Sequence, residues 1–131
     1  MPQQLGKITY GAAHVPLSHA VRAGDFVFIS GQVPTSADGS VVPGGIEAQT
    51  RQVLDHVASA LALAGATLAD VVKTTVFLAD ARDFSVFNKV YATYFPEAPP
   101  ARTTVEARLM IDIRIEIEAV AYAPRHDATP A

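Results

Sequence analysis

The sequence predicts an α+β fold, a single domain in which a mixed sheet carries two helices on one face. Apolar residues alternate with charged ones from residue 113 to residue 118, and a period of two is typical of a half-buried strand. Between Ile46 and Ala64 the apolar period lengthens to about 3.6 residues, which indicates an amphipathic helix. The same reasoning along the chain predicts the order β-β-β-α-β-α-β-β. Because each helix joins two strands, right-handed crossovers and locally parallel pairing are favoured.

The first part of the chain is expected to form strands. A weak pattern indicates a short strand from Lys7 to Tyr10. Stronger patterns predict a hairpin of Ser18–Ala23 and Asp25–Ser30, which turns at Gly24–Asp25. A loop rich in Gly, Pro and Ser follows, with the sequence VPTSADGSVVPGG.

The middle of the chain is expected to alternate between helix and strand. The helix from Ile46 to Ala64 has an apolar stripe that should join the core, and Gly65 is its predicted C-cap. This stripe consists of Ile46, Val53, Leu54, Val57, Leu61 and Ala64. The segment Val71–Ala79 is rich in β-branched residues and carries little charge, which suits a central strand. A second helix, with Asp80 as its N-cap, is expected from Ala81 to about Phe95.

The closing segments, 100–109 and 111–123, are predicted to form a hairpin that turns near Leu109–Met110. In that arrangement Arg102 falls roughly opposite Glu116 on a charged face of the sheet. An arginine that can bind a carboxylate, beside a glutamate that can move protons, would form a reaction site. The alternative interpretation is a solvated face whose charges form weak cross-strand pairs. Two helices cover only one face of such a sheet, so the other face meets solvent or another subunit, which predicts a homo-oligomer.

Composition narrows the classes of protein and of site. The chain has 131 residues, of which 50% are hydrophobic, and a formal net charge of −3 without a dense run of Lys or Arg. This charge argues against a nucleic-acid partner. The absence of cysteine excludes disulfides, thiolate catalysis and cysteine metal sites. No metal site is expected, because the histidines are too scattered for a local motif: His14, His19, His56 and His126.

The termini and the hydropathy pattern give expectations about domain limits and location. A single domain is expected over residues 1–123, followed by a flexible tail over 124–131. The opening residues, MPQQLGKITY, lack a long apolar segment, and no run approaches membrane-spanning length. A cytoplasmic protein without a membrane partner is therefore expected.

Five segments together resemble the RidA (YjgF) family of small imine deaminases. They are ISGQVP at 29–34, VVKTTVFLAD at 71–80, DFSVFNKVYATYF at 83–95, PARTTVEARL at 100–109 and IEIEAVA at 115–121. Each segment alone is a weak signal. Their order and spacing make the resemblance specific, and it covers nearly the whole chain, from Pro16 to Ala121.

The resemblance implies a chorismate-mutase-like fold and a homotrimer with active sites between subunits. It implies hydrolysis of reactive 2-imino acids, or their enamine tautomers, to 2-keto acids and ammonia, a form of metabolite damage control that needs no cofactor. Arg102 would hold the substrate carboxylate, and Glu116 would position the water or carry its proton. The other residues implied to line the cleft are Ser30, Gly31, Asn88 and Thr104.

This chemistry also suits the residue types themselves. An imine carbon is already electrophilic, so the protein need not supply a nucleophile or a metal. It needs an anchor for the carboxylate, a placed water and a group that moves a proton to the departing nitrogen. Arg102 can bind a carboxylate through two parallel charge-assisted hydrogen bonds.

The chain departs from the family pattern at two positions. Leu17 stands after Pro16, where the family's deaminases commonly have a tyrosine, and Thr104 stands where a cysteine is common. Leu17 removes a hydroxyl and makes one wall of the cleft apolar, which is consistent with a bulkier substrate or with weakened activity. Whether Ser18 or His19 compensates is left open.

Other interpretations of the same residues stay open. Ser30 and Asn88 can serve as local hydrogen bonders. Glu118 faces the same way as Glu116 and competes with it for the proton role, or pairs only with Arg114. The alternative functions are a specialised catabolic deaminase with a larger substrate, a non-catalytic protein that binds carboxylate ligands, and an endoribonuclease or translation inhibitor.

Overall fold

The computed structural model of the chain describes residues 2–10 and 13–125, which form six strands and two α-helices. The strands are β1 (Gln3–Tyr10), β2 (Ala13–Ala23), β3 (Phe26–Gln32), β4 (Val71–Leu78), β5 (Ala101–Glu106) and β6 (Ile115–Tyr122). The helices are α1 (Gly45–Leu63) and α2 (Phe84–Tyr94), and 3₁₀ turns at Leu68–Asp70 and Ala81–Asp83 precede β4 and α2. The predicted order of strands and helices is confirmed.

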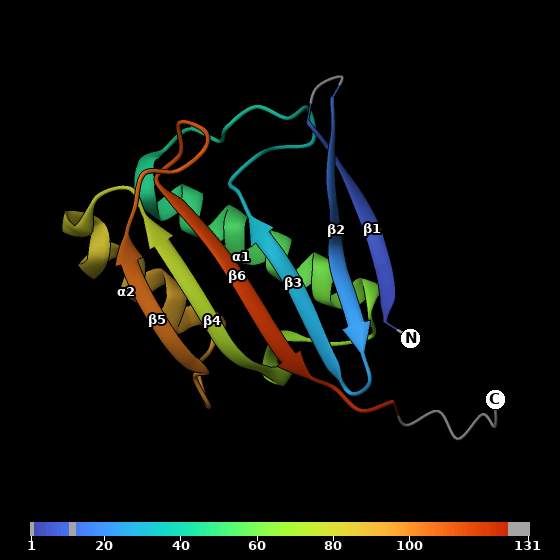
Figure 1. The fold of residues 1–131 in the computed structure, drawn as a ribbon. Helices are drawn as coiled ribbons and strands as arrows, with labels where there is room; N and C mark the ends of the chain where they lie inside the picture. The colour runs from blue at the N-terminus through green and yellow to red at the C-terminus, as the bar shows by residue number, and fades with distance from the viewer. Residues whose placement is uncertain (1, 11–12, 126–131) are drawn as a thin grey trace.

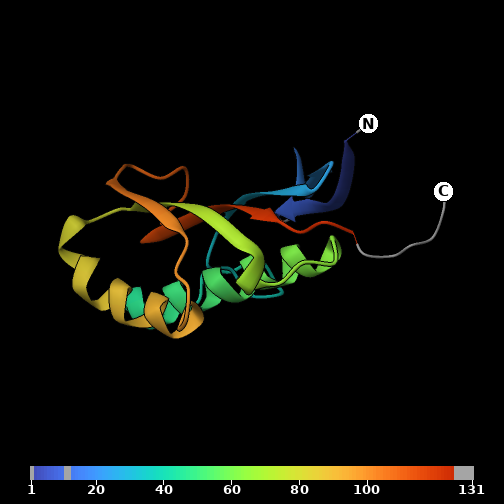
Figure 2. The ribbon, with the colours of Figure 1, turned by 90° about the horizontal axis from the view of Figure 1, so that it is seen from below.

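All six strands form one mixed sheet in the order β1-β2-β3-β6-β4-β5 (Figure 1). The pair β4 and β5 is parallel, and every other neighbouring pair is antiparallel. Both α-helices lie on the same side of the sheet, as Figure 2 shows. The predicted α+β class, with a mixed sheet and two helices on one face, is confirmed. We call the side of the sheet away from α1 and α2 the open face.

The predicted closing hairpin is wrong, because β4 lies between β5 and β6. The chain enters β5 after α2, and this crossover places β5 parallel to β4 at the edge of the sheet. Residues 107–114 then pass the end of β4. The Ala107 N–H donates to the Leu78 carbonyl at 2.9 Å, and the Ala79 N–H donates to the Arg114 carbonyl at 2.9 Å. A local alternation pattern identifies both strands but does not identify their neighbours.

The core lies between the sheet and α1, which packs against β2, β3 and β6. The predicted apolar stripe of α1 is buried along its whole length, from Ile46 to Ala64. It meets the alternate residues of β6 that face the helices, Ile115, Ile117, Ala119 and Ala121. The helical stripe, with its period of 3.6, and the strand residues, with their period of two, therefore pack together in one hydrophobic core, as expected.

The helix ends follow the predicted signals with one difference. Gly65 follows α1 with φ +74°, a left-handed conformation that favours glycine and closes the helix. Asp80 does act as a cap, because its side chain accepts a hydrogen bond from the Arg82 N–H at 2.9 Å. It caps the 3₁₀ turn rather than α2, which begins only at Phe84.

Strands β1 and β2 are longer than expected, and β2 contains Pro16. Proline lacks the N–H that a strand interior uses, so it is tolerated where one side of a strand is unpaired. The pairing of β2 with β3 covers only Ala20–Ala23, which leaves Pro16 beyond that ladder. The register of β1 against β2 also shifts between Lys7 and Thr9, close to Pro16.

A flexible C-terminal tail and the lack of a membrane-spanning segment were also expected. The expected flexible tail lies outside the described residues from position 126 onward. Within residues 2–10 and 13–125, neither helix is both long and apolar enough to cross a membrane.

A buried arginine joins three distant segments of the fold. Arg22 is only 5% exposed. Its Nη1 donates to the carbonyls of Gly24 at 3.2 Å and Ala123 at 2.8 Å, and its Nη2 donates to the Ala64 carbonyl at 2.8 Å. Ala64 is the C-terminal cap of α1, where a positive charge is favourable. Arg22 therefore holds the ends of α1 and β6 against the β2–β3 turn.

Replacing Arg22 with Ala should lower the free energy of unfolding by about 2–4 kcal/mol, because it leaves buried carbonyls without donors. Urea denaturation of Arg22→Ala, beside the exposed control Arg51→Ala, measures this difference. We expect the control to stay within about 0.5 kcal/mol of the wild type. Equal stability of both variants would contradict the role given to Arg22.

Candidate functional site

Arg102 lies on the helix-facing side of the edge strand β5. It is aligned with Thr74 of β4, whose buried side chain faces α2. Its guanidinium carbon lies over the rings of Phe84, Phe87 and Tyr91, at 5.5, 5.1 and 4.9 Å from their centroids. A cation over aromatic faces is stabilised electrostatically without being neutralised. The rings therefore fix the guanidinium and leave its charge available.

No carboxylate of the described residues compensates that charge. The Arg102 side chain makes neither an ion pair nor a hydrogen bond with them, and the ion pairs in this part of the chain join other arginines to Asp80 and Asp83. A guanidinium presents five N–H donors in a planar fork that matches a carboxylate. The donors of the Arg102 guanidinium are thus not used by a carboxylate of the described residues.

A cavity of about 490 Å³ lies beside this guanidinium. Its lining consists of Asn88, Tyr91, Ala92, Phe95, Pro99, Pro100 and Arg102. Asn88 and Arg102, both predicted site residues, therefore come together here. Thr104 follows two positions along β5, and its hydroxyl is buried without a hydrogen-bond partner among the described residues. A buried hydroxyl without a partner is unfavourable, so a ligand that accepts a hydrogen bond from it would be stabilised.

Tyr91 belongs to this region, although the sequence did not single it out as a site residue. Its hydroxyl makes a 2.7 Å hydrogen bond with the Thr74 hydroxyl. Burial raises the pKa of Tyr91 above its ordinary value, which keeps the hydroxyl protonated. The signal in the sequence was the helical spacing of Phe84, Phe87 and Tyr91, which predicts a shared helix face but not an arginine lying against it.

Glu116 lies on the open face, because its neighbours Ile115 and Ile117 point into the core. It is aligned with Phe77 of β4 and is half-buried. A Cβ built on Gly31 would collide with the Glu116 carboxylate and lie 3.0 Å from its Cδ. Only glycine lets that carboxylate lie against the backbone at the end of β3. Glu116 and Gly31 are therefore brought together, as predicted.

The environment of Glu116 favours its protonated form. Burial raises the pKa of Glu116 above its ordinary value, and the negative charge of Glu118 raises it further. The predicted alternative pairing of Glu118 with Arg114 is not observed, because Arg114 instead lies 3.3 Å from the Asp83 carboxylate. Glu116 is thus a carboxyl group of this face that holds a proton more tightly than an ordinary glutamate.

Ser30 and Leu17 adjoin the same end of β3. The Ser30 hydroxyl donates to the Ser18 carbonyl at 2.6 Å, so Ser30 is a hydrogen-bond donor to the backbone, as its alternative interpretation predicts. That bond ties the segment containing the half-buried Leu17 to the Ser30–Gly31 segment. The Ser30 oxygen keeps a lone pair with which it can accept a further hydrogen bond.

The predicted residues, together with Tyr91, therefore divide into two groups on opposite faces of the sheet. We call Asn88, Tyr91, Arg102 and Thr104 the arginine half-site. We call Leu17, Ser30, Gly31 and Glu116 the glutamate half-site. The expectation that Arg102 and Glu116 share a face is wrong, because the register aligns Arg102 with buried Thr74 and Glu116 with Phe77 on the open face.

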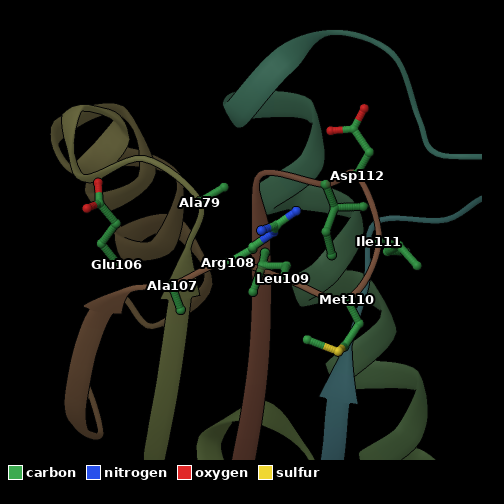
Figure 3. A pocket seen from close by; sticks show the side chains of 9 residues that line it. Ala79, Glu106, Ala107, Arg108, Leu109, Met110, Ile111 and Asp112 are labelled. Carbon is green, nitrogen blue, oxygen red and sulfur yellow. The ribbon is translucent and has the colours of Figure 1, made fainter.

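A larger cavity, of about 650 Å³, lies at the end of the sheet where residues 107–113 follow the last residue of β5, Glu106, which also lines the cavity (Figure 3). Its walls come from this loop and from Ala79. Met110, at the rim of the cavity, is 90% exposed. None of the predicted site residues lines this cavity, so size alone does not locate the candidate site.

Comparisons with known proteins agree on one family. The family model described as "Endoribonuclease L-PSP" matches residues 9–123. A RutC family protein of Pyrococcus horikoshii is 51% identical over 109 residues, which are 82% of this chain and 86% of that protein. The 2-iminobutanoate/2-iminopropanoate deaminase of Escherichia coli K12 is 43% identical over 114 residues, which are 84% of this chain and 89% of the enzyme.

Solved structures give the same result. The crystal structure of the YjgF gene product of Escherichia coli matches with a TM-score of 0.82 and 40% identity, over 92% of this chain and 98% of that one. The crystal structure of yeast Mmf1 matches with a TM-score of 0.86 and 33% identity, over 95% and 100% of the two chains. The fold and most of the chain are therefore shared with these proteins.

Replacing Glu118 with Gln should lower the pKa of the Glu116 carboxyl, because it removes the like charge on the open face. Burial remains, so that pKa should stay above the ordinary value of a glutamate. A titration of the Glu116 carboxyl carbon by NMR measures both effects. Glu106→Gln, on the helix-facing side of β5, should leave the Glu116 pKa unchanged. An equal pKa in Glu118→Gln and the wild type would contradict the like-charge effect.

Proposed function

Because the chain belongs to the YjgF/RidA family that the endoribonuclease L-PSP model describes, we propose that it is a deaminase of 2-imino acids. The substrates are reactive 2-imino acids or their enamine tautomers, and the products are 2-keto acids and ammonia. The observation that supports this most strongly is the unpaired guanidinium of Arg102, held by aromatic rings beside a cavity. Such a group is suited to bind the carboxylate that every 2-imino acid carries.

Glu116 moves the proton in this reaction. It removes a proton from water as the water oxygen bonds to the imine carbon, and the electron pair of the C=N bond moves to nitrogen. It then returns the proton to that nitrogen, which gives a neutral carbinolamine. Glu116 next transfers the hydroxyl proton of the carbinolamine to the nitrogen, the C–N bond breaks, and the carbon becomes a carbonyl as ammonia leaves. A carboxyl group with a raised pKa is a stronger base than an ordinary glutamate and can return the proton that it accepts.

The site that contains both groups forms between copies of the chain. The placement of Arg102 and Glu116 on opposite faces of one sheet supports this arrangement. The open face also exposes apolar side chains: Phe26 is 43%, Phe28 47% and Tyr122 47% exposed. Neighbouring exposed aromatic groups on a sheet face without helices are typical of a subunit interface. By its family resemblance we propose a homotrimer.

Leu17 supports a variant of this function. In this proposal the half-buried Leu17 is an apolar wall of the glutamate half-site and brings no hydroxyl. A specialised deaminase with a larger substrate is therefore the second candidate. The family description also names an endoribonuclease, but a net charge of −3 gives little support for binding a phosphate backbone.

Replacing Arg102 with Ala should reduce imine hydrolysis at least about 100-fold, because the carboxylate loses its bidentate partner. The measurement is the release of ammonia and keto acid from freshly generated 2-iminopropanoate and 2-iminobutanoate. Arg82→Ala is the matched control, because Arg82 is exposed and pairs only with Asp80. We expect that control to keep the wild-type rate.

Three outcomes would overturn parts of this proposal. An unchanged rate in folded Arg102→Ala would remove its assignment as the anchor. Binding of a 2-keto acid without any imine hydrolysis would indicate a carboxylate-binding protein instead. RNA cleavage that is lost in Arg102→Ala would indicate a nuclease, whereas cleavage that persists would indicate a contaminant.

A further inference from the structure

The cavity beside Arg102 extends beyond the group that would bind a carboxylate. On α2 and at its C-cap the lining residues are Asn88, Tyr91, Ala92 and Phe95, and the seven residue steps from Asn88 to Phe95 correspond to about 10 Å. Arg102 lies at the level of Tyr91, because its partner Thr74 is hydrogen-bonded to the Tyr91 hydroxyl. The remaining length of the cavity therefore runs toward the C-terminal end of α2.

The walls of this second part are apolar. Phe95 is buried, and Pro99 and Pro100 precede β5 at the same end of the helix. Proline has no N–H, so these two residues offer a ligand rigid apolar surface without a backbone donor. Tyr91 contributes its ring, since its hydroxyl already bonds Thr74. Ala92 is exposed and leaves space between these walls.

We propose that this part of the cavity is a side-chain subsite, which makes the protein select 2-imino acids with large apolar side chains, aromatic or branched aliphatic. This inference rests on the proposed deaminase function and names its substrate class. With the carboxylate on Arg102, the imine carbon faces the glutamate half-site of a neighbouring copy. The side chain then lies along Ala92, Phe95 and Pro99.

Size and charge both select this class. A cavity of 490 Å³ falls within the range of about 300–1,000 Å³ that holds drug-sized ligands, so a methyl group would leave most of it unfilled. Among the described residues that line the cavity, Arg102 alone is charged, and the first carboxylate occupies it. A second carboxylate or an ammonium group in the subsite would therefore meet no free opposite charge. Burying an uncompensated charge against apolar walls is unfavourable.

The test compares imines generated in situ from phenylalanine, leucine and alanine by an amino-acid oxidase, with semicarbazide as a competing trap. The readout is the protein concentration that halves semicarbazone formation. For the phenylalanine- and leucine-derived imines we expect a concentration at least about tenfold lower than for the alanine-derived imine. Equal concentrations, or a preference for the alanine-derived imine, would overturn the subsite and leave the deaminase function standing.

Ala92→Trp should fill the subsite. We expect it to raise the concentration needed for the phenylalanine-derived imine at least about tenfold and that for the alanine-derived imine less than about threefold. Ala62→Trp is the matched control, an exposed alanine on α1 that does not line this cavity. An equal effect of Ala92→Trp on both imines, or no effect on either, would contradict the subsite. Thermal melting of both variants checks that they fold.

A binding measurement separates this inference from the proposed function. Calorimetry with phenylpyruvate and pyruvate reports the subsite even if no imine is hydrolysed. Tighter binding of phenylpyruvate that Ala92→Trp removes, without imine hydrolysis, would support the subsite and overturn the deaminase. Equal binding of the two keto acids would overturn the subsite.

Discussion

The face of the sheet on which each charged side chain lies constrains the sites that this protein can form. Successive side chains of a strand point to opposite faces, so the register of β5, β4 and β6 decides where each charged group lies. Arg102 follows Thr74 to the helix-facing side, and Glu116 follows Phe77 to the open face. Within one chain the two groups are therefore separated by the thickness of the sheet, and a site that uses both needs a second copy.

This separation has an energetic consequence. An arginine and a glutamate on the same face would pair and neutralise each other, and substrate would have to displace that pair. Here Arg102 is held by three aromatic rings, and Glu116 by burial against the Gly31 backbone. In the proposed function, each group therefore stays available until another copy and a substrate bring the two together. The cost of burial is visible in the raised pKa of Glu116.

Local patterns in the sequence predicted the elements but not their neighbours. The stripe of α1, the cap at Gly65 and the alternation of β6 depend on residues close in the chain, and all are observed. The predicted hairpin of β5 and β6 was wrong because β4 lies between these two strands. The crossover through α2 produces this order, and a local pattern does not reveal it. The aromatic contacts of Arg102 and the bonds from Arg22 to the carbonyls of Ala64 and Ala123 join distant segments, so no local pattern contains them.

The most direct test of a site shared between copies mixes two variants, Arg102→Ala and Glu116→Gln, each of which should be inactive alone. They are unfolded and refolded together in equal amounts, and mass spectrometry verifies that mixed oligomers form. If each site takes Arg102 from one copy and Glu116 from another, random mixing should restore about a quarter of the wild-type imine hydrolysis. Mixed oligomers as inactive as the two parents would contradict the account.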